Sequence, residues 1–199
     1  MMRKLFAILL LLCALTGAAA ADDFGQSYDL FQTLYAENVN FINDNTGRHL
    51  LPLDFKGDFD SEGERIYVLS SGALDVQLKL DDLASQIAWC QITLTAPADM
   101  SYGDSKHNDF TTSGYHSYAL LMAMHKAAAP AQRYALVEEV NNGLAAGGGV
   151  YETQVGDYRL ACQSQNGVAT MRFENELLMG TGLETEEEAL PTLEIKDQE

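Results

Sequence analysis

Basic residues are scarce in this chain, and acidic residues outnumber them. The 199 residues include 12 lysines and arginines against 29 aspartates and glutamates, so the formal net charge is −17 at pH 7. A charge of this sign and size repels phosphate groups, which argues against nucleic-acid binding and disfavours anionic lipid surfaces. The composition therefore suits a cationic partner, or serves solubility alone.

Long apolar runs are also missing, apart from one near the start. Two basic residues, Arg3 and Lys4, precede the apolar run Leu5–Leu15, and small residues follow up to Ala21. This succession is typical of a secretory signal peptide. The run of 11 residues is shorter than the roughly 20 that a bilayer-spanning helix needs. We therefore predict a signal peptide at residues 1–21 and a secreted or periplasmic mature chain without a membrane anchor, with a charge of 10 − 29 = −19.

Cysteine is scarce as well, since only Cys90 and Cys162 remain outside the predicted signal peptide. In an oxidising compartment an even pair is most simply a disulfide. Closing a loop of 162 − 90 = 72 residues would remove about 4 kcal/mol of unfolded-state freedom. The sequence therefore predicts a Cys90–Cys162 bridge that brings early and late strands together, with two buried free thiols as the alternative.

The chain lacks every short motif that would assign a catalytic chemistry. No G-x-S-x-G nucleophile elbow, no H-E-x-x-H zinc motif and no phosphate-binding loop ending in G-K-[ST] occurs. No two histidines have the i, i+4 spacing of a helical metal site. The histidines are His49, His107, His116 and His125. We therefore expect no catalytic residue, no cofactor and no metal ligand, and the sequence favours a protein that is not an enzyme.

Apolar residues at helical spacing predict one helix near the start and two in the middle. The first begins after Ser27, a suitable N-cap, and ends before Gly47. Its apolar stripe consists of Tyr28, Phe31, Leu34, Tyr35, Val39 and Ile42. Two more helices are predicted at 115–128 and 131–142, and the polar segment 97–113 before them is predicted as a surface loop.

Alternation of apolar and polar residues predicts two groups of strands. Asn166-Gly167 is a strong hairpin signal between the last two of them. The predicted strands are 50–55, 65–70, 74–80, 86–95, 150–155, 158–164 and 168–173. Consecutive strands joined by short turns indicate an α+β fold with antiparallel sheet and helices packed on one face, in the order α-β(3–4)-αα-βββ.

The chain length fits one compact domain over residues 22–175. Its halves, about 22–96 and 110–175, each contain helical material followed by strands, which would also fit a degenerate tandem duplication. Residues 176–199 are rich in glutamate and are predicted to form an acidic, flexible tail.

One acidic segment has part of the pattern of a calcium-binding loop. Asp58, Asp60 and Glu62-Gly63 match the front of an EF-hand loop, D-x-D-x-E-G. The twelfth position, where a glutamate should close the site, is Leu69, and the flanking segments are predicted strands. An acidic surface turn is the favoured interpretation, and calcium binding stays open.

The one tryptophan, Trp89, alternates with Cys90 and should lie on the opposite face of its strand. An exposed tryptophan there would mark a contact surface, while helices covering that face would bury it. The sequence favours an exported, non-enzymatic module that binds a protein or peptide partner. A secreted hydrolase with an unfamiliar site, using Asp58, Asp60 or His107, and a calcium-binding module are the alternatives.

Overall fold

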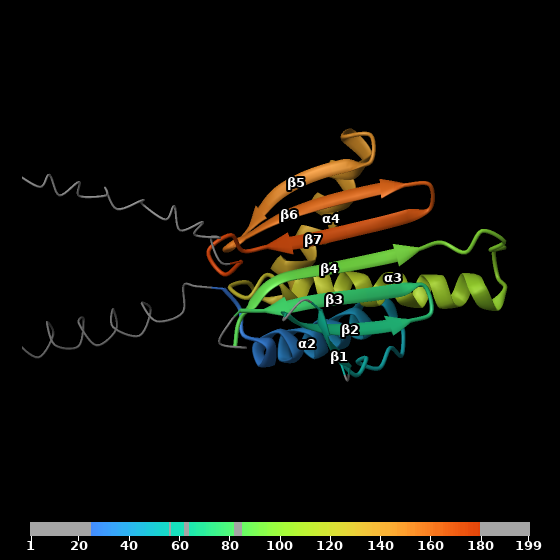
Figure 1. Ribbon diagram of the computed structural model, residues 1–199. Coiled ribbons are helices and arrows are strands. Elements are labelled where there is room, and N and C mark those ends of the chain that lie inside the picture. The colour runs from blue at the N-terminus through green and yellow to red at the C-terminus, as the bar shows by residue number, and fades with distance from the viewer. Residues whose placement is uncertain (1–24, 56, 62–63, 82–84, 180–199) are drawn as a thin grey trace, which may run out of the picture.

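The computed structural model describes residues 25–55, 57–61, 64–81 and 85–179 (Figure 1). The predicted signal peptide and residues 180–199 of the predicted tail lie outside this part. The elements in chain order are α2 (Tyr28–Thr46), β1 (Asp58–Ser61), β2 (Glu64–Ser71), β3 (Leu74–Leu80), β4 (Ile87–Thr95), α3 (Ser105–Ala123), α4 (Pro130–Ala146), β5 (Val150–Val155), β6 (Tyr158–Gln165) and β7 (Val168–Glu174).

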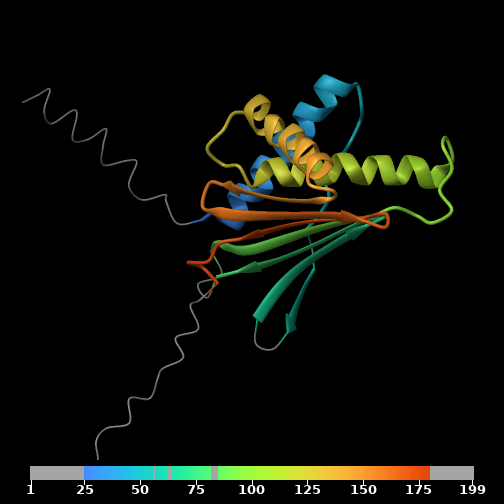
Figure 2. The ribbon, with the colours of Figure 1, turned by 90° about the horizontal axis from the view of Figure 1, so that it is seen from above.

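The strands form one antiparallel sheet in the order β1-β2-β3-β4-β7-β6-β5. The first four strands and the last three make separate meanders, which join where β4 pairs with β7 at the centre (Figure 1). The helices α2, α3 and α4 lie on one face of the sheet (Figure 2). The predicted α+β class, with helices on one face and the order α-β(3–4)-αα-βββ, is confirmed.

Strict alternation in β3 explains why one face of the sheet meets the helices. Leu74, Val76 and Leu78 are fully buried, while the polar residues between them are half-buried. The register places Leu78 opposite Cys90 of β4, so the apolar side chains of both strands join one layer under the helices. The opposite face of the sheet, called the open face below, has no helix over it in the described part of the chain.

The predicted first helix is confirmed as α2. The hydroxyl of Ser27 accepts the N–H of Leu30 at its start, and Gly47 ends it with φ +68, a left-handed conformation that glycine adopts without strain. In its apolar stripe, Tyr28 is half-buried and the others are buried in the core: Phe31, Leu34, Tyr35, Val39 and Ile42.

The prediction of a surface loop at 97–113 is wrong in its second half, because α3 begins at Ser105. The carboxylate of Asp104 accepts the N–H of His107 at 2.7 Å and caps the helix. The first turns of α3 project beyond the apolar core, so their polar sequence shows no apolar period. The helix ends at Ala123, before the predicted end at 128.

The prediction of a strand at 50–55 is also wrong. The side-chain amide of Asn43 bonds to both the N–H and the C=O of Leu50, each at 2.8 Å. The N–H of Leu53 donates to the Tyr35 hydroxyl at 3.2 Å. Side chains of α2 thus satisfy backbone groups that a neighbouring strand would otherwise pair.

The predicted Cys90–Cys162 disulfide is a further correction, since both thiols are free and buried. Cys90 lies on β4 opposite Phe173, and Cys162 lies on β6 opposite Met171, so β7 runs between them. Adjacent strands are about 4.8 Å apart, which puts the cysteines about 10 Å apart across the sheet. A disulfide needs α-carbons within about 7 Å. Early and late strands are joined instead by the backbone hydrogen bonds of β4 and β7.

Burial raises the pKa of both the Cys90 and the Cys162 thiol to about 12. The thiolate is the nucleophile and the metal ligand, so neither cysteine is reactive at neutral pH. Both act as small apolar residues of the core.

Candidate functional site

The outer edge of β5 is one of the two borders of the sheet. β5 is the last strand on its side, and no further strand lies beyond it in the described part of the chain (Figure 1). The two-residue turn after Val155 makes Val155 and Tyr158 a hydrogen-bonded pair, and bonding pairs then recur every second residue. In line with this alternation, the N–H of Ser164 donates to the C=O of Gly149 at 2.7 Å.

This alternation decides which backbone groups face outward. Tyr151, Thr153 and Val155 bond inward to β6, so the N–H and C=O groups of Glu152 and Gln154 point away from the sheet. The N–H of Val150 is engaged in the turn after α4, where it donates to the C=O of Gly147 at 3.4 Å. Such a row of outward groups is a template for pairing with another strand.

Helix α4 holds β5 in place from the helix side of the sheet. The hydroxyls of Tyr151 and Thr153 both donate to the carboxylate of Glu139 on α4, at 2.6 and 3.1 Å. Gly143 makes this possible, because a Cβ at that position would overlap the Tyr151 ring. The bond to Glu139 also raises the pKa of the Tyr151 hydroxyl.

The open face beside β5 carries a second carboxylate and a shallow hollow. Glu152 is exposed there and has no hydrogen-bonded or ion-paired partner among the described residues. It lies opposite Ala161 of β6, and Ala161 lies opposite Arg172 of β7. The small Ala161 side chain leaves a hollow of about 360 Å³ between the two charged side chains, bordered also by Val150.

Trp89 lies on the open face as predicted, yet it is only 8% exposed. Charged side chains cover it, and the helices do not. The guanidinium of Arg172 lies 4.7 Å from the ring centroid, and its Nε donates to Glu174 at 2.6 Å. A further bond to Gln91 at 3.1 Å fixes the same guanidinium. Trp89 is therefore part of a cation–π stack and is not an exposed contact residue.

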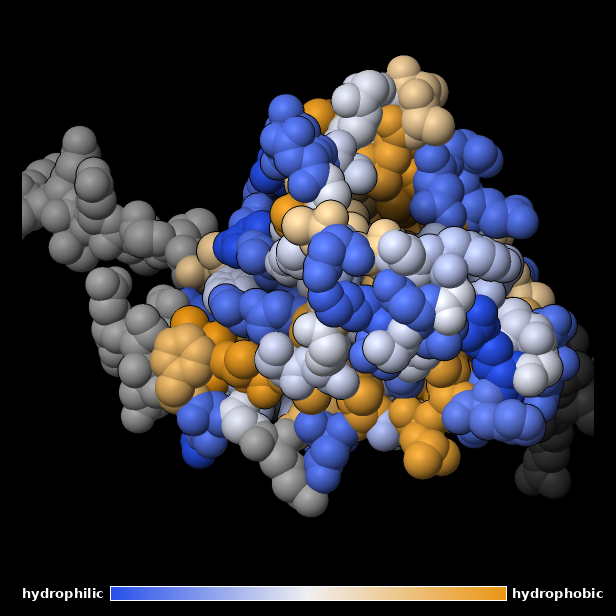
Figure 3. Space-filling view, turned by 90° about the vertical axis from the view of Figure 1, so that its right-hand side faces the viewer, coloured by the Kyte–Doolittle hydropathy of each residue, from blue (hydrophilic) through white to orange (hydrophobic). Residues whose placement is uncertain are grey.

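A polar pocket lies at the end of the molecule where the β2–β3 turn meets α3. Its volume is about 320 Å³, and its walls include Leu53, Leu74, Asp109 and His116. A second hollow, of about 340 Å³, shares Leu74 and Asp109 with it and extends toward Lys106. Figure 3 faces this end of the molecule, where hydrophilic surface predominates and smaller apolar areas lie between.

His116 is a buried polar group of this pocket. The Tyr35 hydroxyl accepts the N–H of Leu53, so its hydrogen is available for Nδ1 of His116 at 2.8 Å. Neutral His116 then carries its proton on Nε2. Burial lowers the pKa of His116, and burial raises the pKa of Tyr35 to about 12, so both groups are uncharged at neutral pH.

The hydroxyl of Ser113, which also lines this pocket, is engaged by backbone. It lies 3.3 Å from both the C=O of Ser71 and the N–H of Ala73, so it donates to one and accepts from the other. No hydrogen bond joins it to His116 among the described residues. The pair therefore lacks the nucleophile–base contact of a serine hydrolase.

The described residues of the acidic segment that resembled a calcium loop form a strand. Asp58 and Asp60 belong to β1, which pairs with β2, and the carboxylate of Asp58 forms an ion pair with Arg65. Glu62 lies outside the described residues. Within the described ranges, no group of three or more His, Cys, Asp or Glu side chains converges well enough to hold a metal ion.

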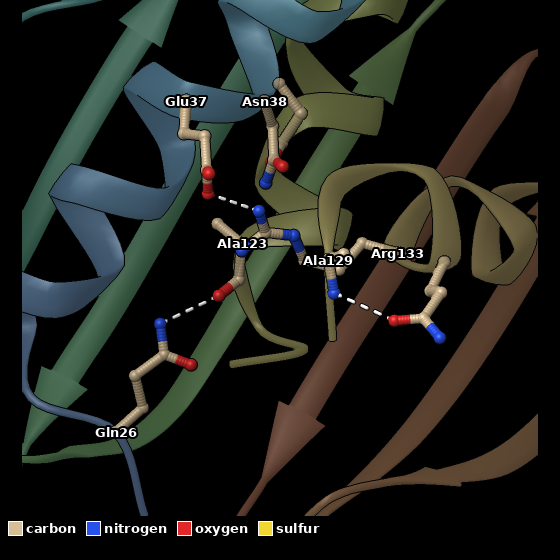
Figure 4. A network of polar contacts seen from close by, with 8 residues as sticks. Gln26, Glu37, Asn38, Ala123, Ala129 and Arg133 are labelled. Carbon is tan, nitrogen blue, oxygen red and sulfur yellow. Dashed lines mark hydrogen bonds and ion pairs between the residues drawn. The ribbon is translucent and has the colours of Figure 1, made fainter. Parts of the chain in front are cut away.

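A buried arginine joins the helices on the opposite side of the core from the open face. Arg133 of α4 is 1% exposed, and its guanidinium forms an ion pair with Glu37 of α2 (Figure 4). The Glu37 side chain is 48% exposed, so water solvates one side of the pair. A positive group near the end of α3 also suits the helix dipole.

Two amides complete this cluster. Asn38 donates to the carbonyl of Ala119 at 3.3 Å. Gln26 donates to the carbonyl of Ala123 at 2.7 Å (Figure 4). The Ala123 carbonyl belongs to the last turn of α3, where the helix itself supplies no donor. The cluster is structural, because it ties α2, α3 and α4 together.

Sequence reasoning missed His116 and Arg133 as buried groups. His116 is considered from the sequence only as a metal ligand, although Ser113 and Leu120 share its helix face at i−3 and i+4, which is a usable signal of burial. Arg133 follows Pro130 in a helix whose pattern is weakly apolar, and nothing in that pattern marks it as buried. His49 and His107 line neither of the two pockets at the α3 end.

Comparison of the chain with protein-family models, curated proteins and solved structures found no match. Among the helices of the described residues, none combines the length and the apolar character needed to span a membrane.

Proposed function

We propose that this chain is an exported, non-enzymatic module that binds a protein or peptide partner, and that the partner adds a strand to β5. The proposal of export rests on the signal-peptide pattern of residues 1–21. The proposal of binding rests on one observation, the outward N–H and C=O groups of Glu152 and Gln154 at a sheet edge.

Strand addition suits this edge because the edge is ordered before a partner arrives. An extended partner gains main-chain hydrogen bonds from the outward groups and specificity from alternate side chains. The bonds from Tyr151 and Thr153 to Glu139 hold β5 against α4, so little ordering entropy remains to oppose binding.

The hydrolase and calcium alternatives have weaker support. The Ser113 hydroxyl is engaged by backbone, and Asp58 is paired with Arg65. The polar pocket at His116 offers a hydrogen-bond donor and a carboxylate, which can orient a small ligand without attacking it.

Amide hydrogen exchange tests the proposal. The probe is a panel of synthetic ten-residue peptides built on Thr-Val repeats, with basic, neutral or acidic central residues. We expect at least one peptide to slow the exchange of the Glu152 and Gln154 amides while leaving the β1 amides unchanged. No slowing with any peptide would refute strand addition at β5.

Two proline variants supply the matched control. Gln154→Pro removes an outward N–H of β5, and Asp60→Pro removes an outward N–H of β1 at the opposite border. The N–H of Val68 donates to the C=O of Gly57, so Gly57 and every second residue after it bond inward and Asp60 points outward. We expect Gln154→Pro to abolish peptide binding and Asp60→Pro to preserve it. Equal binding by both variants would place the partner elsewhere.

A further inference from the structure

The charges that border β5 specify the partner further. Resting on the proposed function, we infer that the segment added to β5 carries two consecutive basic residues, one facing Glu152 and the next facing Glu139. The observation behind this is that one carboxylate lies beside β5 on each face of the sheet, at nearly the same point along the strand: Glu152 of β5 itself and Glu139 of α4.

The two carboxylates lie on opposite sides of the sheet. Glu152 is on the open face, and Glu139 reaches over the other face to the hydroxyls of Tyr151 and Thr153, the residues on either side of Glu152. Successive side chains of an added strand also point to opposite faces. A residue opposite Glu152 therefore has a neighbour directed toward Glu139, which requires adjacent basic residues in the partner.

Neither carboxylate is neutralised within the described residues. Glu139 accepts hydrogen bonds only from uncharged hydroxyls, and Glu152 has no partner. The nearest arginines of the open face, Arg159 and Arg172, both pair with Glu174, at 3.4 and 2.6 Å. The border of β5 is thus negative, and opposite charges across a strand pair stabilise the pairing.

Two other occupants of this edge are disfavoured by the same charges. A second copy of the chain would bring its own Glu152 and Glu139 against the first pair, and like charges opposite each other destabilise strand pairing. The chain's own C-terminal residues 180–199 are strongly acidic, with Glu184, Glu186, Glu187 and Glu188 in one short run. Both would have to overcome repulsion that a basic segment does not meet.

The test uses fluorescent ten-residue Thr-Val peptides that differ only at the centre. The central residues are Lys-Arg, Gln-Gln, Glu-Glu, or Lys and Arg separated by one valine, which puts both charges on one face. We expect the adjacent Lys-Arg peptide to bind most tightly to the full chain, and we expect its affinity to decrease as salt is added. The separated pair should bind about 2–5-fold less tightly, because it meets only one carboxylate.

Charge-removing variants separate the two contacts. Glu152→Gln and Glu139→Gln should each lower the affinity for the Lys-Arg peptide about 2–5-fold and leave the affinity for the Gln-Gln peptide unchanged. Glu138→Gln is the matched control, since Glu138 is the exposed neighbour of Glu139 on α4 and makes none of its bonds to β5. Glutamine keeps the acceptor for Tyr151 and Thr153, so the fold is retained.

The outcomes distinguish this inference from the function beneath it. If the neutral or acidic peptide protects the β5 amides as well as the basic one, strand addition stands and the basic partner is refuted. If no peptide protects them, strand addition itself fails. If Glu152→Gln instead self-associates in sedimentation and binds no peptide, the carboxylates serve only to prevent pairing between copies, which refutes the inference.

Discussion

The two borders of the sheet differ in length, support and charge. β1 has four residues, and together with β2 it splays away from the helix layer (Figure 2). β5 has six residues and is held by α4. At β1 the carboxylate of Asp58 is neutralised by Arg65, whereas Glu152 at β5 has no such partner among the described residues.

This difference shows how the two borders of one sheet can be built differently. Short length and compensated charge make β1 a poor template for another strand, and the proposed strand addition requires the longer, firmly supported β5 to be a better one. The following changes test that contrast, from the largest expected effect to the smallest.

Arg133→Ala should have the largest effect, because it removes the contact that anchors α4 and thereby β5. The loss of a fully buried side chain should lower the free energy of unfolding by about 3 kcal/mol, measured by urea denaturation. Arg133→Met should recover part of this, since it refills the space. Amide exchange should speed up at β5 more than at β1, and a uniform change would contradict the anchoring role.

Proline at adjacent positions of β5 should separate inward from outward backbone groups. Thr153→Pro removes a ladder hydrogen bond and should cost about 2–3 kcal/mol in urea denaturation. Gln154→Pro removes only an outward N–H and should cost less than about 1 kcal/mol. The reverse order would show that the alternation along β5 has been assigned wrongly.

Gly143→Ala should destabilise the protein, against the usual trend for helices. Alanine normally gains about 1 kcal/mol over glycine inside a helix, but here its Cβ would overlap the Tyr151 ring. We expect a net loss of about 1–2 kcal/mol in thermal or urea unfolding. In a Tyr151→Ala background the same change should become stabilising, and a double-mutant cycle measures this coupling.

Acidification should weaken the junction of α2 and α3 at His116. Burial lowers the pKa of His116 in the folded chain, so the unfolded chain takes up a proton first as the pH falls. The free energy of unfolding should therefore decrease below about pH 6.5, the ordinary histidine value, and be insensitive to this group above it. His116→Gln should have a flatter profile over this range. If His116→Gln and the unaltered protein lose stability equally steeply with pH, the pH dependence comes from carboxylates and not from His116.

Arg65→Ser at β1 should have the smallest effect. Arg65 and Asp58 are 61% and 40% exposed, and solvated ion pairs of this kind contribute less than about 1 kcal/mol. Urea denaturation should show little change, and peptide binding at β5 should be unaffected. A loss as large as that of Arg133→Ala would mean that the β1 border is not the weakly supported one.

Much of the fold was predictable because local patterns determined it. The apolar stripe of α2, the alternation of β3 and the Asn166-Gly167 turn each depend on a few neighbouring residues. Asn166 and Gly167 indeed have φ +53 and +78, as such a turn requires. The start of α3 was missed because its polar turns depend on a cap at Asp104 and not on apolar spacing.

The candidate site was less predictable because it depends on the order of the strands. The two-residue turn after Val155 already determines which residues of β5 pair with β6, but no local signal says that β5 is a border. The same gap produced the wrong disulfide, since the sequence does not show that β7 lies between Cys90 and Cys162. Arg133 became visible as a buried group only when three helices were packed together.

The pairing of β4 with β7 has a consequence for how the chain folds. Cys90 and Phe173, opposite each other in this pair, are 173 − 90 = 83 residues apart, so the sheet closes only after the last strand has been made. Until then the N-terminal meander has an unprotected apolar flank, and a nascent or truncated chain would be prone to aggregate. Synthesis of all seven strands must therefore precede stable folding. The polypeptide stays unfolded for longer than one whose strands pair only with their neighbours in sequence.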